Sequence, residues 1–387
     1  MPMRSITEEL TALADRGLAR RARPVDGAQG AVITVDGRAA INFSSNNYLG
    51  LADHPDLIEV AARAMHTQGF GAGASRLIVG NLSAHRQLEA RIARWKRTEA
   101  ALLFNSGYQA NVGAVSALAG PEDAIYSDAL NHASLIDGAR LSRATVHVYP
   151  HVDLEALAAR LAEGASFRRR LIITDSVFSM DGDAAPLVEL VRLARRYSAL
   201  LFVDEAHATG VLGPQGAGLA LDLGVDLQMG TLGKALGGFG AFIAASRPLV
   251  DYLTQRARSF VYSTALPVPV AAFAHAAIEL AASSEGDRRR DQLNHLGRQL
   301  HQGFRLLGVR TASRPAHVLP LVIGDPTHTM TLSEALLDRG VFAQGIRPPT
   351  VPEGSSRLRF ALQATHTDSH VAAALSALGD LLPPAAL

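Results

Sequence analysis

Three short, unbroken apolar runs, separated by longer helical patterns, restrict the fold of this 387-residue chain more than any other feature. They occupy residues 100–104, 171–174 and 199–203. Such uniformly apolar strands occur where helices cover both faces of a parallel sheet. Strands that alternate with helices also indicate crossover units. We therefore expect an α/β fold with a mostly parallel central sheet and helices on both faces, in a large domain over residues 43–279.

The segments on either side of this region have different patterns. Residues 1–42 begin with a helical pattern and continue with an apolar run before the turn Asp36-Gly37, which predicts a helix and a strand pair. A turn-rich stretch at 281–287 precedes a helical pattern and short strands, so we expect a smaller α+β domain over 280–387. Residues 259–278 lack charged side chains but contain Pro267 and Pro269, so we expect a loop that enters a buried helix rather than a membrane span.

Composition excludes several classes of function. The chain has no cysteine, which removes disulfides, thiolate metal sites and cysteine nucleophiles. A formal net charge of +1 gives no general attraction to nucleic acid or to an anionic membrane. The first residues include Glu8, Glu9 and Asp15 where a signal peptide needs an apolar stretch, so we expect a cytoplasmic protein.

Lysine is nearly absent from the chain. Only Lys96 and Lys234 occur, and all the other residues among the 37 Lys and Arg are arginine. Lys96 lies in a basic helical run, and we interpret it as a solvated charge that arginine could replace. Lys234 lies in a glycine-rich loop, which suggests a need for an amine that can lose its proton, because a guanidinium cannot.

Polar residues follow each apolar run, at Asn105-Ser106-Gly107, Asp175-Ser176 and Asp204-Glu205. In open parallel sheets the ligand crevice lies beyond these carboxyl ends. Asp204 and His207 at one strand end, with the amine of Lys234, are the parts that a pyridoxal phosphate site needs. Taken singly, Asp204 is as readily a helix N-cap, His207 a structural polar contact and Lys234 a surface charge.

Several familiar motifs fail on inspection. The glycines at 69–73 follow a helical pattern, whereas a dinucleotide-binding loop follows a strand. Residues 230–234 lack the first glycine of a P-loop, since Gln228 stands there. No Gly-x-Ser-x-Gly elbow occurs. His366 and His370 are spaced like zinc ligands, but no glutamate follows His366, so we expect no metal site.

Six segments in chain order closely resemble the α-oxoamine synthases, at residues 42–50, 105–108, 131–134, 175–183, 203–207 and 231–234. This resemblance implies a fold-type-I pyridoxal phosphate enzyme that condenses an amino acid with an acyl thioester and releases carbon dioxide. It also implies a homodimer with its sites at the interface. Glu205 and Ala208 stand where aspartate and glycine are common in the family.

Residues 346–352 and 357–359 most resemble the family member that uses L-alanine and a pimeloyl thioester in biotin synthesis. The acyl carrier, coenzyme A or acyl carrier protein, stays open. The alternatives are a sister enzyme, such as glycine C-acetyltransferase, 5-aminolevulinate synthase or serine palmitoyltransferase, and a non-catalytic binder of phosphate ligands on the same scaffold.

The resemblance also implies roles for matched residues. Lys234 would form the Schiff base and remove the Cα proton, Asp204 would pair with the pyridine nitrogen, and His132 would stack on the ring. The other expected cofactor contacts are Gly107, Tyr108, Ser179, His207, Thr231 and, from a partner subunit, Thr264. The expected substrate contacts are Arg347 for the amino-acid carboxylate, Arg20 and Thr350 on the acyl side, and Asn46 and His132. Arg20 lies in a basic run and is as readily a solvated charge.

Overall fold

The computed structural model describes residues 5–314 and 316–382, which form two compact units. The larger unit contains Leu51–Ser179 and Ala184–Arg290. The smaller unit contains the described parts of Met1–Gly50 and Asp291–Leu387, together with Met180–Asp183. The predicted division into an N-terminal segment (1–42), a large domain (43–279) and a small domain (280–387) stays a prediction.

The larger unit is built on a seven-stranded sheet with the order β4-β10-β9-β8-β7-β5-β6. Its strands are β4 (Ala100–Phe104), β5 (Ala124–Asp128), β6 (Thr145–Tyr149), β7 (Arg170–Asp175), β8 (Leu200–Asp204), β9 (Leu227–Thr231) and β10 (Ala241–Ala245). Only β10 runs antiparallel to its neighbours. The predicted α/β fold with a mostly parallel central sheet is therefore confirmed.

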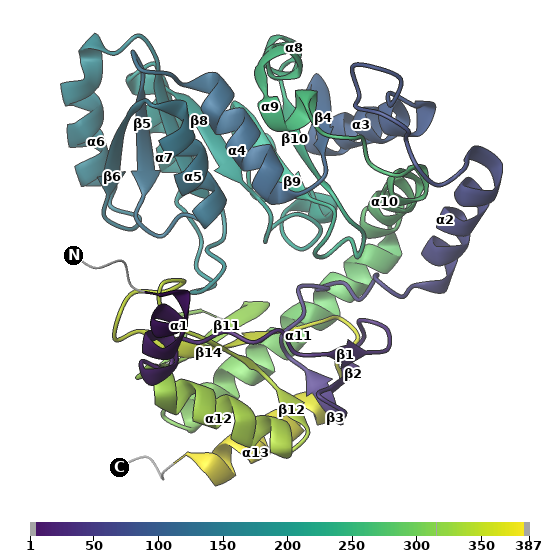
Figure 1. Cartoon of the computed structure of the whole chain (residues 1–387), viewed down its shortest axis with the longest axis vertical. Coiled ribbons are helices and arrows are strands. Elements are labelled where there is room, and N and C mark those ends of the chain that lie inside the picture. The colour runs from purple at the N-terminus through teal and green to yellow at the C-terminus, as the bar shows by residue number, and fades with distance from the viewer. Residues whose placement is uncertain (1–4, 315, 383–387) are drawn as a thin grey trace. The chain divides into compact units, whose positions relative to one another are not determined.

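Helices cover both faces of this sheet, and several of them lie alongside it in Figure 1. The helices of the larger unit are α2 (Pro55–Gln68), α3 (Ser83–Lys96), α4 (Gly107–Leu118), α5 (Ala133–Ser142), α6 (Leu154–Glu163), α7 (Leu187–Arg196), α8 (Arg247–Arg256), α9 (Arg258–Val261) and α10 (Val268–Ala281). Leu171 and Ile173 of β7 pack in one core with α4, α5 and α8, whereas Ile172 packs in a second core with α6 and α7. Successive residues of a strand point to opposite faces of the sheet, so a strand with helices on both faces must be apolar throughout.

The uncharged stretch at 259–278 forms the end of the short helix α9, a loop and most of the buried helix α10, as expected. Pro267 is the N-cap of α10 and Pro269 lies in its first turn, where proline does not break a helix. Among the residues that the structure describes, no helix is long and apolar enough to cross a membrane.

The smaller unit contains two sheets, with the strand orders β1-β2-β3-β12 and β11-β14-β13. Its strands are β1 (Val25–Asp26), β2 (Val32–Val35), β3 (Arg38–Asn42), β11 (Val318–Gly324), β12 (Val341–Phe342), β13 (Gln344–Ile346) and β14 (Ser356–Ala361). Its helices are α1 (Ile6–Asp15), α12 (Pro326–Asp338), α13 (Asp368–Leu381) and most of α11 (Ser284–Leu306), which begins in the larger unit. The helix and strand pair predicted near the N-terminus are present. Asp36 and Gly37, with φ of 50° and 76°, make the two-residue hairpin turn.

The interpretation of Lys96 as a solvated charge is wrong. Lys96 is the last residue of α3, it is 0% exposed, and its Nζ donates hydrogen bonds to Glu205 Oε2 and, at 2.5 Å, to the carbonyl of Ala217. The other oxygen of Glu205 accepts the backbone N–H of Ala220 at 2.8 Å. The space around the pair is tightly filled, because a Cβ atom on Gly218 would collide with the Glu205 carboxylate. A buried ion pair therefore holds the segment that follows Asp204 to the end of α3.

Candidate active site

A cavity of about 160 Å³ lies in the larger unit, where β7, β8 and β9 end. Seven predicted site residues line it: Gly107, Tyr108, His132, Asp204, His207, Thr231 and Lys234. Asn111, Ser134, Asp175, Ala206 and Met229 complete the lining. The carboxyl ends of neighbouring parallel strands bring these side chains together, as expected for a ligand crevice in such a sheet.

Lys234 lies on a tight loop between β9 and β10. Its Nζ is 2.9 Å from Nε2 of His207. The loop closes through hydrogen bonds of the Leu232 N–H to the Gly240 carbonyl at 2.8 Å and of the Gly238 N–H to the Leu232 carbonyl at 2.9 Å. Gly237 has a φ of 68°, and a side chain there would collide with the backbone of Ala52. The glycine thus lets the loop pack closely and keep the amine at the cavity.

Asp204 is a buried carboxylate with a fixed orientation. Its side chain is almost fully covered, and its Oδ1 accepts the backbone N–H of Ala206 at 2.8 Å. Its Oδ2 accepts an amide N–H of Asn111 at 2.7 Å. These two hydrogen bonds fix both oxygens of the carboxylate in place. The cavity therefore presents a preorganised negative charge to a ligand.

A second buried carboxyl group, Asp175, lies beside Asp204 in register at the end of β7. Its Oδ2 accepts the backbone N–H of His132 at 2.8 Å. Burial raises the pKa of Asp175 well above its usual value, and the nearby charge of Asp204 adds to this. Burial and the charge of Asp204 thus both oppose ionisation of Asp175.

Asp175 and Asn111 were missed as site residues. Asp175 ends an apolar strand just as Asp204 does, so the same signal could have identified it. Asn111 lies one helical turn after Gly107 in a mainly small and apolar helix. Its position in the sequence gives no sign that its amide reaches the end of a distant strand.

The first turn of α4 lines the other side of the cavity. Ser106 is the N-cap, and its side chain accepts the backbone N–H of Gln109 at 3.2 Å. A Cβ atom on Gly107 would meet only the side chain of Met229, at 3.6 Å, so the backbone of this turn is open to a ligand. N–H groups at a helix start and the helix dipole attract phosphate and other anions. The cavity thus suits a molecule with an anionic group at one side and a proton-bearing nitrogen facing Asp204.

Two predicted cofactor contacts do not line this cavity. Ser179 follows the end of β7 by four residues and is absent from the lining. Thr264 lines a separate narrow hollow with Phe260 and Leu266, and its carbonyl accepts the side-chain amide of Asn105 at 2.8 Å.

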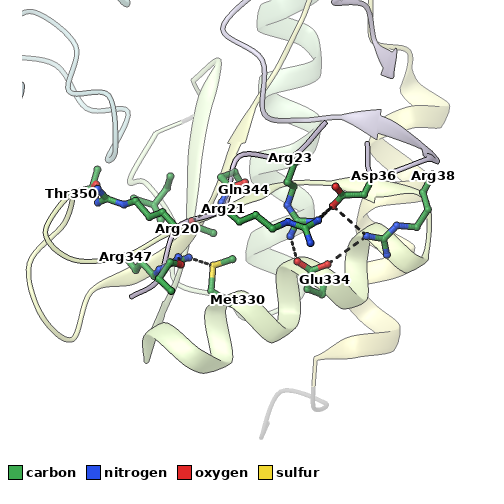
Figure 2. A pocket seen from close by; sticks show the side chains of 13 residues that line it. Arg20, Arg21, Arg23, Asp36, Arg38, Met330, Glu334, Gln344, Arg347 and Thr350 are labelled. Carbon is green, nitrogen blue, oxygen red and sulfur yellow. Dashed lines mark hydrogen bonds and ion pairs between the residues drawn. The ribbon is translucent and has the colours of Figure 1, made fainter. Parts of the chain in front are cut away.

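A second cavity, of about 630 Å³, lies in the smaller unit and is lined by three of the predicted substrate residues, Arg20, Arg347 and Thr350. Figure 2 shows these three at one end of the cavity, with a network of ion pairs around Asp36 and Glu334 at the other. The guanidinium of Arg20 donates to Thr350 Oγ1 at 3.3 Å. Arg20 is exposed, so its two interpretations, a solvated charge and a substrate contact, both stay predictions.

Arg347 is the buried cation of this cavity, with 8% of its surface exposed. It donates to the carbonyl of Ala19 and to the sulfur of Met330, but among the described residues its buried Nε has no hydrogen-bond partner. Burial and the nearby Arg20 charge lower its pKa, yet an arginine stays charged at neutral pH. A buried cation with an unused donor suits a carboxylate.

Asn46 is the one predicted substrate residue of the smaller unit that lies outside this cavity. Its Oδ1 accepts hydrogen bonds from the guanidinium of Arg359 at 3.1 and 3.2 Å and from the hydroxyl of Tyr48 at 3.0 Å. Within the described ranges, no group of three or more histidine and acidic side chains is arranged to hold a metal ion.

Comparison with known proteins gives concordant results. The family model "Aminotransferase class I and II" matches residues 38–378. An 8-amino-7-oxononanoate synthase of Citrifermentans bemidjiense is 52% identical over 94% of both chains. Another, of Anaeromyxobacter sp. strain K, is 51% identical over 98% of this chain and 95% of its own.

Solved structures show the same fold. Serine palmitoyltransferase of Sphingomonas wittichii matches with a TM-score of 0.90 and 32% identity over 98% of each chain. A serine palmitoyltransferase of S. paucimobilis with bound PLP matches with a TM-score of 0.91 and 28% identity over 97% of this chain and 96% of its own. An 8-amino-7-oxononanoate synthase of Francisella tularensis has a TM-score of 0.76 and 25% identity, over 88% of this chain and 97% of its own.

Proposed function

Because this chain belongs to the 8-amino-7-oxononanoate synthases, within the aminotransferase class I and II family, we propose that it condenses L-alanine with a pimeloyl thioester. The products are 8-amino-7-oxononanoate, an intermediate of biotin synthesis, carbon dioxide and the free thiol. The chain is a pyridoxal phosphate-dependent acyltransferase of fold type I. The observation that carries this proposal is the cavity that brings Lys234, Asp204 and His132 together.

The residues of this cavity fit pyridoxal phosphate. The start of α4, with Gly107 and Tyr108, is open to the phosphate, and Thr231 lines the same cavity. The fixed carboxylate of Asp204 suits the pyridine N–H. When bound, the cofactor supplies a protonated ring that accepts electron density from the substrate, which permits both deprotonation at Cα and decarboxylation.

Lys234 would hold the cofactor through Nζ. Its amine would also be the base for the Cα proton of alanine, because the glycine loop fixes its backbone at the cavity. Asp204 would keep the ring nitrogen protonated, since its carboxylate is held in place by Asn111 and the backbone N–H of Ala206. His132 would stack on the ring, and His207 and Ser179 would contact its oxygen side.

We assign the substrate contacts in the smaller unit by charge. Arg347 would bind the carboxylate of alanine, because it combines burial with an unused Nε–H. Arg20 and Thr350 would line the acyl side, and Asn46 is a further proposed contact.

The substitution Arg347→Lys is expected to raise KM for L-alanine about tenfold to a hundredfold, because a charge-assisted hydrogen bond contributes about 1.5–3 kcal/mol. Steady-state kinetics with alanine varied at saturating thioester measures this. Arg21→Lys is the matched control, because Arg21 lines the same cavity but is paired with Asp36 and 70% exposed. An unchanged KM for L-alanine in Arg347→Lys would contradict the proposed contact between Arg347 and the alanine carboxylate.

We also propose a cytoplasmic homodimer in which Thr264 reaches the phosphate of the partner subunit's cofactor. Support comes from the neighbouring Tyr262, which is 71% exposed, and from the position of Thr264 outside the cavity of its own chain. Acyl carrier protein remains a candidate donor of the pimeloyl group.

The likeness to serine palmitoyltransferases favours one alternative, a sister synthase that uses another amino acid. Product analysis decides between them, with L-alanine, glycine or L-serine each offered with pimeloyl-coenzyme A and with pimeloyl-acyl carrier protein. We expect 8-amino-7-oxononanoate from alanine with at least one carrier. A sister enzyme that uses another acyl thioester would form no product here, but glycine or serine, and not alanine, would change the absorption spectrum of the bound cofactor. No product from any pair and no spectral change with any of the three amino acids would support a non-catalytic binder.

A further inference from the structure

A chain of hydrogen bonds joins Asp204 to the ring of His132 through two residues without an assigned role. Asn111 donates one amide N–H to Asp204 Oδ2 at 2.7 Å and the other to Ser134 Oγ at 2.8 Å. Ser134 Oγ lies 2.7 Å from Nδ1 of His132. Asn111 and Ser134 are both 0% exposed, so water does not compete for these contacts. Buried polar chains of this kind fix the orientation of each member.

The direction of each hydrogen bond follows from the ends of the chain. The charged carboxylate of Asp204 only accepts, so Asn111 must present its NH2 group to it. The second N–H of the same NH2 group points to Ser134 Oγ, which leaves the serine hydroxyl proton for Nδ1 of His132. The backbone N–H of Ser134, which can only donate, also reaches Nδ1, at 3.3 Å. Two donors therefore converge on Nδ1, which must be unprotonated.

We propose that Asn111 and Ser134 are positioning residues that hold His132 as the neutral Nε2–H tautomer, a donor to an oxygen atom of the bound substrate. The hydrogen bond made by one ring nitrogen decides which tautomer a histidine adopts. Among the described residues Nε2 makes no hydrogen bond, and His132 lines the cavity, so this N–H is available to a ligand. The proposal rests on the function proposed above.

The charges around His132 are consistent with a neutral ring. Desolvation in the cavity is the main cause that lowers the pKa of His132, and the positive charge of Lys234 adds to it. Asp204 and, from α5, Asp137 act in the opposite direction without reversing the shift. Asp175 accepts the backbone N–H of His132, and burial raises the pKa of Asp175. The donors on Nδ1 stabilise the neutral ring further, since they have no acceptor once Nδ1 is protonated.

The test measures the tautomer directly by ¹⁵N NMR of the full-length protein labelled at histidine, because ¹⁵N shifts separate an N–H nitrogen from an unprotonated one. Comparison with a His132→Gln sample assigns the signals of His132 among the 14 histidines. We expect Nδ1 unprotonated and Nε2 protonated at neutral pH, with and without the cofactor. A protonated Nδ1 would overturn the proposal.

The substitution Ser134→Ala tests the positioning role. Loss of one donor to Nδ1 is expected to raise the pKa of His132 by about half a unit to one unit, as read from the same NMR signals. The acid limb of the kcat pH profile should move up with it, and kcat should fall about fivefold. An unchanged titration and an unchanged profile in the folded variant would show that Ser134 is only structural.

The outcome is separable from that of the proposed function. If the protein forms no 8-amino-7-oxononanoate, the proposed function fails whatever the tautomer. If the product forms but Nδ1 is protonated, only the positioning proposal fails.

Discussion

Replacing Lys234 with alanine or with arginine is expected to reduce the formation of 8-amino-7-oxononanoate by roughly 10²- to 10⁴-fold while the protein stays folded. Alanine removes the amine. Arginine keeps the positive charge, but its guanidinium does not lose a proton and so cannot act as the base. The two variants thus separate the chemistry of a primary amine from the presence of a charge near His207, 2.9 Å from Lys234 Nζ.

Mass spectrometry of the product measures the loss of activity, and the midpoint temperature of thermal unfolding shows whether each variant stays folded. Lys234 is only partly buried and lines the cavity, so we expect both variants to fold. Activity within tenfold of the natural protein in either variant would contradict the assigned role.

The substitution Lys96→Met is expected to lower the free energy of unfolding by about 3–5 kcal/mol, the cost of leaving one member of a buried ion pair without its partner. Both side chains of the Lys96–Glu205 pair are 0% exposed. The remaining carboxylate would lie in a space where the backbone N–H of Ala220 is its other hydrogen-bond donor. Urea unfolding of each variant measures the difference.

Two further variants make this measurement specific. Arg97→Met is the matched control, because the adjacent Arg97–Asp222 pair is 60% and 56% exposed and such surface pairs contribute about 1 kcal/mol or less. The double variant Lys96→Met with Glu205→Leu should recover most of the lost stability, since no unpaired charge remains. A loss in Lys96→Met no larger than that in Arg97→Met would refute the account.

The two lysines show what sequence reasoning reaches and where it stops. Lys234 could be identified because its chemistry lies next to a turn and a strand end, both of which leave local signals. Lys96 could not be interpreted correctly, because its neighbours in sequence are solvated basic residues whereas its partner Glu205 lies in a loop 109 positions away. A helical pattern gives the position of a side chain on its own helix and not the charge that it faces.

For the fold and for the site alike, sequence reasoning predicted the features that leave local signals and missed those that depend on distant contacts. The apolar strands and the polar residues at their ends predicted the sheet and most of the cavity, because burial on both faces selects such sequences. The joining of the N-terminal strands to the C-terminal part in one unit depends on pairing between β3 and β12, in which Ile41 lies opposite Val341. The proposed roles of Asn111 and Ser134 likewise depend on tertiary contacts with Asp204 and His132, which the sequence does not indicate.

The central claim is that the amine of Lys234 binds the cofactor, and borohydride reduction of the protein loaded with pyridoxal phosphate tests it most directly. Reduction converts the bond between amine and cofactor into a stable one, and peptide mass spectrometry then locates the added mass. Only two lysines compete for the label, and Lys96 is 0% exposed. The account predicts the label on Lys234, whereas a label on Lys96, or a protein that takes up no cofactor, would contradict it.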